Sequence, residues 1–203
     1  MKHNNRIFRV KTHLSNIKKA ARGFTLLRYK KKQKIMNKRL KEHISLAVTA
    51  VNGCSLCSFV HTKVALSSGM SNEEISALLE QDMGNVRHED AVALAFAQHY
   101  ADSKENPDDD AIKRLIDEYG VEKAELIVAV CHMITMTNGM GISMHLFLER
   151  LKFKRDKRSN IFLEMLNPLL TMVLFPILAV YYFVKCRIKT LRLLPKSYLN
   201  YNN

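Results

Sequence analysis

Apolar residues recur at every third or fourth position through most of the chain, which is the spacing of one face of an α-helix. The first such stretch covers residues 7–27, where Arg and Lys fill the positions between the apolar ones. We therefore predict a basic amphipathic helix, which suits either a membrane interface or packing against the domain that follows. Its apolar positions are Ile7, Val10, Leu14, Ile17, Ala21 and Phe24.

The central part of the chain has helical spacing throughout, divided by residues that end or begin helices. Asn52-Gly53 favours left-handed backbone and so ends a helix. Ser71 followed by Glu74 forms a capping box, and Asp108–Asp110 suit the positive end of a helix dipole. We expect Gly120 to separate two helices, and Gly139 and Gly141 to interrupt or end the next. The expected ranges are 35–51, 54–68, 72–79, 86–103 and 109–119, then one from 121 and a last one through Leu151.

Residues 165–184 form a stretch of twenty residues without a charge, which is long enough to span a membrane. Pro168 and Pro176 lie inside it and are expected to kink or break the helix. Basic clusters precede and follow the stretch, so the distribution of Lys and Arg gives no orientation. A single span, a re-entrant or interfacial segment, burial in a subunit interface and a core helix all suit this pattern.

Composition supports an all-α fold rather than a sandwich or barrel. The 203 residues include 7 Gly, 4 Pro and no Trp, and few stretches alternate apolar and polar positions. This length suits one well-buried domain with additional tails. We expect a basic N-terminal extension at 1–34, one helical domain at 35–152, and a basic and apolar C-terminal extension at 153–203.

Charge is distributed unevenly along the chain. Residues 1–41 hold 15 basic residues (Lys or Arg) and no acidic residue (Asp or Glu). Residues 42–149 hold 6 basic and 17 acidic residues, and residues 150–203 hold 11 basic and 2 acidic residues. An acidic centre between two basic flanks indicates an anionic partner. We expect a membrane surface, and a nucleic acid is less suitable because the aromatic residues of the N-terminal flank are sparse and irregular.

Cysteine usage indicates thiol chemistry. Cys54 and Cys57 are three residues apart, at the start of an expected helix, where both sulfurs lie on one face. His61 lies one turn further on the same face, so a base and a helix N-terminus can both activate a thiol. The remaining Cys131 and Cys186 stand alone, unlike the framework of a small secreted domain. We therefore expect a cytoplasmic protein, at the cytoplasmic face of a membrane.

Glu42 joins this group through the turn at Asn52-Gly53. It precedes Cys54 by twelve residues, about 18 Å along an unbroken helix, which is too far to act on a sulfur. If the chain folds back at Asn52-Gly53 into two antiparallel helices, Glu42 comes within a turn of His61. We expect the carboxylate to orient the imidazole and the imidazole to take the thiol proton.

The pattern Glu42-x11-Cys54-x2-Cys57-x3-His61 resembles the active-site signature of the alkylhydroperoxidase D and carboxymuconolactone decarboxylase superfamily. The following Ala65, Gly69 and Glu74-Ile75 are also similar to that family. The resemblance covers residues 35–150. Leu56 differs, because the best-known peroxidase members have a histidine between the cysteines.

The resemblance implies an all-α antioxidant enzyme that reduces a hydroperoxide without metal or cofactor. Cys57 would attack the peroxide, and Cys54, expected to be the more exposed, would close the disulfide. An external dithiol, a thioredoxin-like or lipoyl protein, would reduce it, and members commonly form trimers or multiples of them. A helix N-terminus favours Cys54 as nucleophile instead, so the order of attack stays open.

Three other functions fit the residues. The thiols could serve a membrane-associated redox sensor or scaffold without turnover, or the chain could be a decarboxylase-like enzyme. Structural zinc is the third, with Cys54, Cys57 and His61 as ligands and His43 or His132 as the fourth. Cys131 and the methionines at 133, 136, 140 and 144 are expected in a core or subunit interface.

Overall fold

The computed structural model describes residues 6–82, 84, 87–188 and 193–194, and within these ranges it contains seven α-helices, one 3-10 turn and no strand. The prediction of an all-α fold is therefore confirmed. The helices are α1 (Val10–Lys30), α2 (Lys38–Asn52), α3 (Ser55–Leu66), α4 (Asn72–Leu79), α5 (His88–Asp102), α6 (Asp109–Leu151) and α7 (Ile161–Ile188), with the 3-10 turn η1 at Lys31–Gln33.

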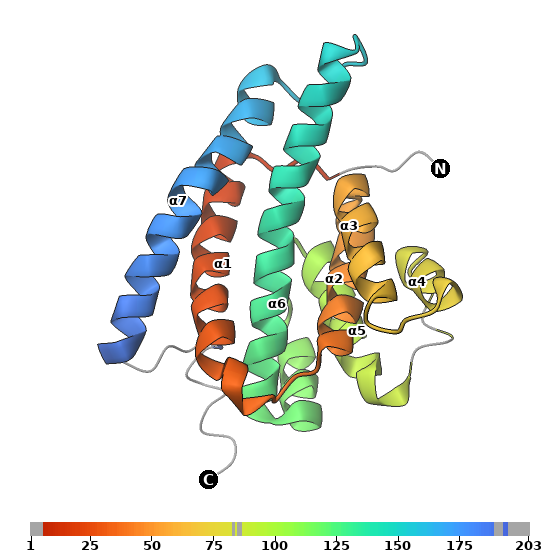
Figure 1. Cartoon of the computed structure of the whole chain (residues 1–203), viewed down its shortest axis with the longest axis vertical. Coiled ribbons are helices and arrows are strands. Elements are labelled where there is room, and N and C mark those ends of the chain that lie inside the picture. Colours follow the sequence, from red (N-terminus) through yellow and green to blue (C-terminus); the bar gives the residue numbers. More distant parts are fainter. Residues whose placement is uncertain (1–5, 83, 85–86, 189–192, 195–203) are drawn as a thin grey trace.

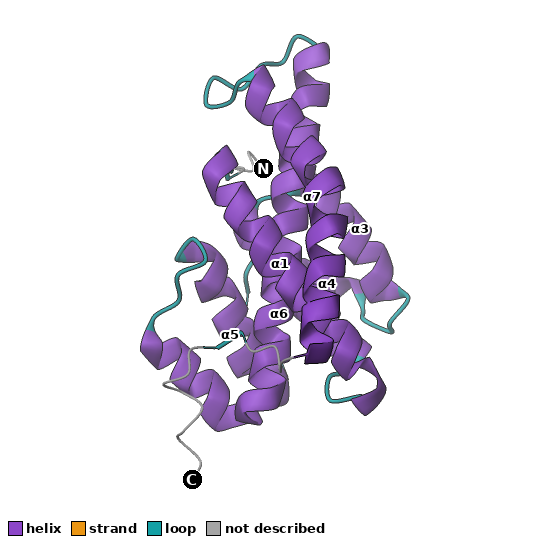
Figure 2. Cartoon of the chain, turned by 90° about the vertical axis from the view of Figure 1, so that its left-hand side faces the viewer, coloured by secondary structure: helices purple, strands orange, loops and turns teal. Residues whose placement is uncertain are grey.

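The long helix α6 occupies the centre of the molecule (Figure 1). Helices α1 and α7 pack against it and against each other, and α2 and α5 pack on its other side. Helices α1 and α7 run in the same direction, opposite to the upper part of α6, and α3 and α4 lie outside α2 (Figures 1 and 2). The main core lies between α2, α5 and α6, and smaller apolar clusters lie where α6 meets α1, α3 and α7.

Helix α1 is packed into this structure by its apolar stripe. Ile17 and Ala21 are fully buried, and Gly23 allows a close approach to α6 because a Cβ there would lie 3.0 Å from the Ala129 carbonyl oxygen. The buried face also includes two polar residues, His13 and Asn16. Of the two roles that the sequence allowed for the stripe, the structure contains the packing role.

Helices α2 and α3 are joined by the tight turn that the sequence predicted. The side chain of Asn37 caps α2 by accepting a bond from the Leu40 amide, and Gly53 ends it in left-handed backbone with φ 72°. A side chain is disfavoured in this conformation, so glycine suits the position. Cys54 then caps α3, and its sulfur accepts a bond from the Cys57 amide.

Helix α6 corrects one prediction. Gly120 leaves helical geometry, with φ 71° and ψ 160°, as expected. Gly139 and Gly141, expected to interrupt or end the helix, lie within a continuous helix through Leu151. Their role is close packing: a Cβ on Gly139 would lie 2.6 Å from His13 Nδ1, and one on Gly141 would lie 2.9 Å from two sulfurs.

Helix α7 also differs from the prediction. It continues through both Pro168 and Pro176, where a kink or break was expected. Residues on both sides of the prolines, including Leu170 and Leu178, pack on α1 and stabilise the helix despite the lost backbone bonds. At its start, Glu164 is buried and accepts two bonds from the Arg150 guanidinium at the end of α6.

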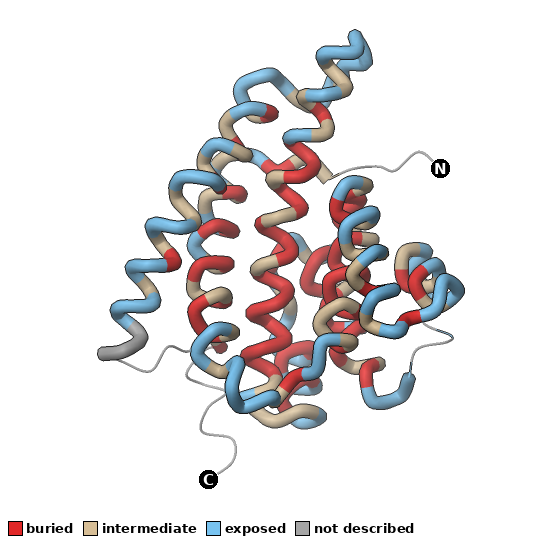
Figure 3. The backbone as a smooth tube through the Cα atoms, in the orientation of Figure 1, coloured by how far each residue is buried: buried red, intermediate tan, exposed pale blue. Residues whose placement is uncertain are grey.

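Two described helices are long and apolar enough to cross a membrane, and they differ sharply in burial. The most apolar 18-residue part of α6 is 83% buried inside the protein, as expected for a core helix, whereas that of α7, within residues 161–185, is 17% buried. Figure 3 shows the outer side of α7 exposed along its length. Burial in the core therefore explains the apolar residues of α6. It does not explain those of α7, which are mostly exposed.

Candidate functional site

The cysteine pair lies at the N-terminus of α3, facing α6. Cys54 and Cys57 form a disulfide with Cα atoms 5.2 Å apart. The Cys57 sulfur lies 3.8 Å from the carbonyl oxygen of Thr137 on α6. Because Cys54 is the capping residue, its sulfur lies at the positive end of the α3 dipole, where a thiolate would be stabilised.

His61 and Glu42 are brought together by the turn at Gly53. The Nδ1 atom of His61 lies 2.9 Å from Glu42 Oε2, and both side chains are mostly buried. A carboxylate only accepts hydrogen bonds, so Nδ1 carries the proton and Nε2 is the basic nitrogen of the neutral ring. The expected proximity of Glu42 and His61 is thus present, and His61 is one turn, about 6 Å of rise, beyond Cys57.

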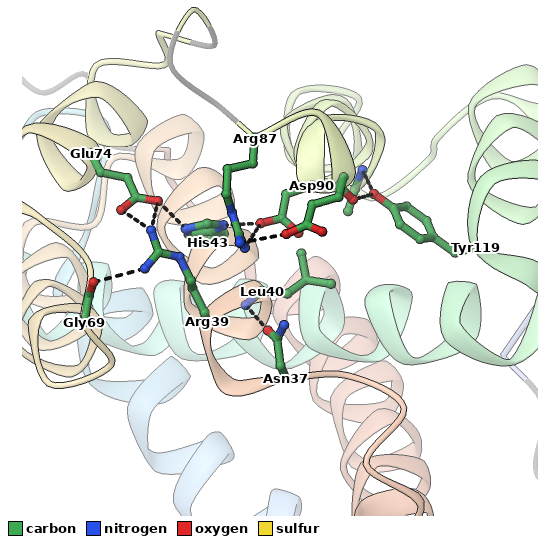
Figure 4. A network of polar contacts seen from close by, with 11 residues as sticks. Asn37, Arg39, Leu40, His43, Gly69, Glu74, Arg87, Asp90 and Tyr119 are labelled. Atoms are coloured by element: carbon green, nitrogen blue, oxygen red, sulfur yellow. Dashed lines mark hydrogen bonds and ion pairs between the residues drawn. The ribbon is translucent and has the colours of Figure 1, made fainter.

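A polar network fixes the rotation of α2 and so the direction of Glu42. His43, the next residue, is buried, with Nδ1 2.9 Å from Asp90 on α5 and Nε2 2.9 Å from Glu74 on α4 (Figure 4). Successive helical residues point about 100° apart, so anchoring His43 toward α4 and α5 directs Glu42 toward α3.

Two arginines complete this network (Figure 4). Arg39 donates two bonds to Glu74, and Arg87 donates one to Asp90. Although partial burial acts in the opposite direction, the bonds from Arg39 and His43 hold the pKa of Glu74 below its ordinary value. The two nitrogens of His43 therefore tie α2 to both α4 and α5.

Residues 6–8, here called the N-terminal strap, cover the cysteine pair. Phe8 is buried in one apolar cluster with Cys54 and Cys57, together with Ile142 and Leu146 of α6. Nothing in the sequence pattern predicted this position for Phe8, because the contact joins residues nearly fifty positions apart.

The strap is anchored at both ends. Arg6 donates from its backbone amide to the Asn52 carbonyl and from its guanidinium to the buried Glu105, with one bond of 3.0 Å. Its guanidinium also lies 4.4 Å from the centre of the Phe8 ring. Asn167 of α7 donates to the Phe8 carbonyl at 2.9 Å.

The relative exposure of the two sulfur-bearing residues is the reverse of what was expected. Cys54, expected to be the more exposed, is 1% exposed, and Cys57 is 8% exposed. The cause is the strap together with the capping position, which turns Cys54 inward. Leu56, in the place of the family's histidine, is exposed and contributes no imidazole.

The residues named for zinc do not assemble into a metal site. His43 is engaged by two carboxylates, and His132 packs against Tyr100 on the far side of α6. Among the described residues, no group of three or more His, Cys, Asp or Glu side chains is arranged to hold a metal ion. Cys131 is a fully buried core residue, and this burial raises the pKa of its thiol well above the ordinary value.

Fold and motif together define an all-α thiol protein of the alkylhydroperoxidase D-like class. The family model described as the carboxymuconolactone decarboxylase family matches residues 18–98, a range that begins within α1 and contains all four predicted site residues. Residues 18–98 are thus similar to that family, and the resemblance inferred from the motif is confirmed over this range.

The chain is also similar to the uncharacterized protein YdfG of Bacillus subtilis strain 168. It is 28% identical over 116 residues, which cover 56% of this chain and 78% of that protein. No solved structure matches the chain. The similarity to this family supports a related function.

Proposed function

We propose that the protein is a thiol-dependent peroxidase, with Cys57, Cys54, His61 and Glu42 as its active residues. The observation that carries the proposal is a disulfide at the N-terminus of α3 followed, one turn later on the same helix face, by a partly buried His61 that is bonded to Glu42. A structural disulfide would not need an oriented base one turn away.

In the oxidising half of the reaction, His61 Nε2 takes the proton of the reduced Cys57, directly or through water. The thiolate attacks one peroxide oxygen, so that an S–O bond forms and the O–O bond breaks. The leaving alkoxide takes the proton from the imidazolium and departs as an alcohol, which leaves Cys57 as a sulfenic acid. Glu42 stabilises the imidazolium while it exists.

The second step closes the disulfide. The Cys54 thiolate attacks the Cys57 sulfur and displaces hydroxide, which is released as water after protonation. Cys54 suits this role because the α3 N-terminus stabilises its thiolate. An external dithiol then attacks the more exposed Cys57, expelling Cys54 as a stabilised leaving group, and its second thiol completes the reduction.

The test is consumption of cumene hydroperoxide by the full chain with dithiothreitol as reductant. Wild-type protein is expected to turn over, and Cys57→Ser and Cys54→Ser to lose turnover. Cys131→Ala, which removes a buried thiol outside the site, serves as the matched control and is expected to keep it. Activity that survives the loss of both Cys54 and Cys57 would contradict the proposal.

Trapping the sulfenic acid assigns the order of attack. Dimedone is expected to label Cys57 in Cys54→Ser protein treated with one equivalent of peroxide. Labelling confined to Cys54 in Cys57→Ser protein would reverse the two roles.

A redox sensor without turnover is the second candidate, and the burial of both cysteines under Phe8 favours it. Such a protein would form the disulfide once per molecule with peroxide and be reduced slowly. Sustained peroxide consumption over many equivalents with dithiothreitol separates the enzyme from the sensor.

A further inference from the structure

Helix α7 presents one continuous apolar face that nothing in the described structure covers. Its buried side holds the polar groups Glu164, Asn167 and Thr171, while the outward side carries no charge from residue 165 to 184. The exposed large apolar side chains are Ile161, Phe162, Met165, Leu169, Met172, Val173, Ile177, Val180, Tyr181, Phe183 and Val184. This distribution is the reverse of a surface helix of a globular protein.

Exposed cations border this face at both ends. The turn between α6 and α7 carries Lys154, Arg155 and Lys157, and it also exposes the aromatic ring of Phe153 almost completely. At the other end Lys185 is exposed. A charge-free apolar face between cations matches the chemistry of a bilayer surface with anionic headgroups.

The packing of α7 opposes a transmembrane arrangement. Helix α1 runs alongside α7, as the contact of His13 with Thr171 and that of the Phe24 and Phe175 rings show. A bilayer deep enough to enclose α7 would also enclose the exposed Lys11 and Lys18 of α1. An in-plane arrangement does not enclose these lysines in the apolar part of the bilayer.

A second copy of the chain is a poorer occupant for the same face. Cations lie at both ends of α7, so pairing two α7 helices in either direction places like charges opposite one another.

We propose that the outward face of α7 docks in the plane of an anionic lipid bilayer, with the cations at its two ends on the headgroups. The protein is then a peripheral membrane protein whose cysteine pair lies in the water-facing part of the fold.

Sedimentation of the full chain with vesicles tests this. The vesicles are phosphatidylcholine alone, or phosphatidylcholine with a minor share of phosphatidylglycerol. The protein is expected to bind the vesicles that contain phosphatidylglycerol. This binding should weaken as the salt concentration rises, and alkaline carbonate should release the protein. The triple variant Leu169→Gln, Met172→Gln, Ile177→Gln is expected to bind at least about tenfold more weakly.

The matched control changes three exposed apolar residues on α3: Phe59→Gln, Val60→Gln and Leu66→Gln. It is expected to bind as wild type does. Lys154→Gln with Lys157→Gln is expected to weaken binding to the anionic vesicles by about fivefold per cation. Circular dichroism checks that each variant keeps its helix content.

Several outcomes would overturn the proposal. Lack of binding to anionic vesicles, or equal loss in the α3 control, would show that α7 is not the docking face. Retention through alkaline carbonate would identify a span. A dimer in sedimentation equilibrium that the α7 triple variant converts to monomer would identify a second copy as the occupant.

Discussion

At the residue scale, the direction of His61 depends on a single carboxylate. Nδ1 of the ring is held by Glu42, so the other nitrogen is the base. The order of the residues along α2 and α3 predicted this contact, because an antiparallel register places Glu42 within a turn of His61. The predicted roles of Glu42 and His61 can be tested by substitution.

Glu42→Gln tests the role of the carboxylate. Glutamine keeps a hydrogen-bond acceptor but removes the charge that stabilises the imidazolium, so kcat/KM for the hydroperoxide should fall at least about tenfold. The pH profile should shift as well, which loss of packing would not cause. Glu118→Gln, on the exposed side of α6, is the control and should leave both unchanged.

Gly141→Ala tests the packing of α6 against the disulfide. The added Cβ would lie 2.9 Å from the sulfurs of both Cys54 and Cys57. Free thiols can rotate away from it, whereas bonded sulfurs cannot, so the variant should favour the reduced form. A cost of about 1–3 kcal/mol is typical of such overpacking and outweighs the gain in helix propensity.

Equilibration with glutathione measures this effect. The variant should be reduced at a higher ratio of oxidised to reduced glutathione than wild type. Met144→Ala, an exposed position on the same helix, should behave as wild type does. An unchanged equilibrium in Gly141→Ala would show that α6 moves to accommodate the methyl group.

At the element scale, α1 and α7 are joined through a buried histidine. His13 Nε2 lies 2.7 Å from the Thr171 hydroxyl and 3.2 Å from the Asn167 carbonyl. Burial lowers the pKa of His13 from 6.5 to about 4, partly offset by the bond to Asn167. The ring is therefore neutral in the folded protein at pH values where the unfolded chain is protonated.

This difference predicts a pH dependence of stability. The unfolded chain binds the extra proton, so the contribution of His13 is present above pH 6.5 and is lost as the pH falls toward about 4. The loss should reach on the order of 3 kcal/mol. Urea unfolding should show His13→Gln losing less stability than wild type over this range. Parallel curves for the two proteins would contradict the prediction.

At the scale of the whole molecule, the cysteine pair is enclosed by segments far apart in sequence. The strap, α3 and α6 meet there, and α7 holds the strap because Asn167 donates to the Phe8 carbonyl across 159 positions. Access to the disulfide is therefore controlled by the arrangement of the entire chain rather than by the motif alone.

Phe8→Ala should open this enclosure. Removing the ring exposes both sulfurs, so dithiothreitol should reduce the disulfide several times faster, at a stability cost of about 3–5 kcal/mol for a buried Phe. Phe162→Ala, at an exposed position on α7, is the matched control and should be reduced at the wild-type rate. Equal rates in all three proteins would show that the strap does not limit access.

Local signals were sufficient for most helix boundaries and for the contact of Glu42 with His61. Asn52-Gly53, Ser71 and Gly120 marked boundaries correctly because capping and left-handed backbone depend on neighbouring residues only. Predictions from local signals were wrong at Gly139 and Pro176. There, contacts with other helices stabilise the helix more than the local preference of glycine or proline destabilises it.

The sequence by itself determined an all-α chain and the placing of Glu42 beside His61, since these follow from periodicity and spacing. Its motif also resembles the family whose model matches residues 18–98. Only the tertiary structure decided that Phe8 covers the cysteines, that Cys54 is the deeper of the two, and which side of α7 is exposed. The physical reason is range: burial depends on which distant segments pack together, and spacing along the chain carries no information about that.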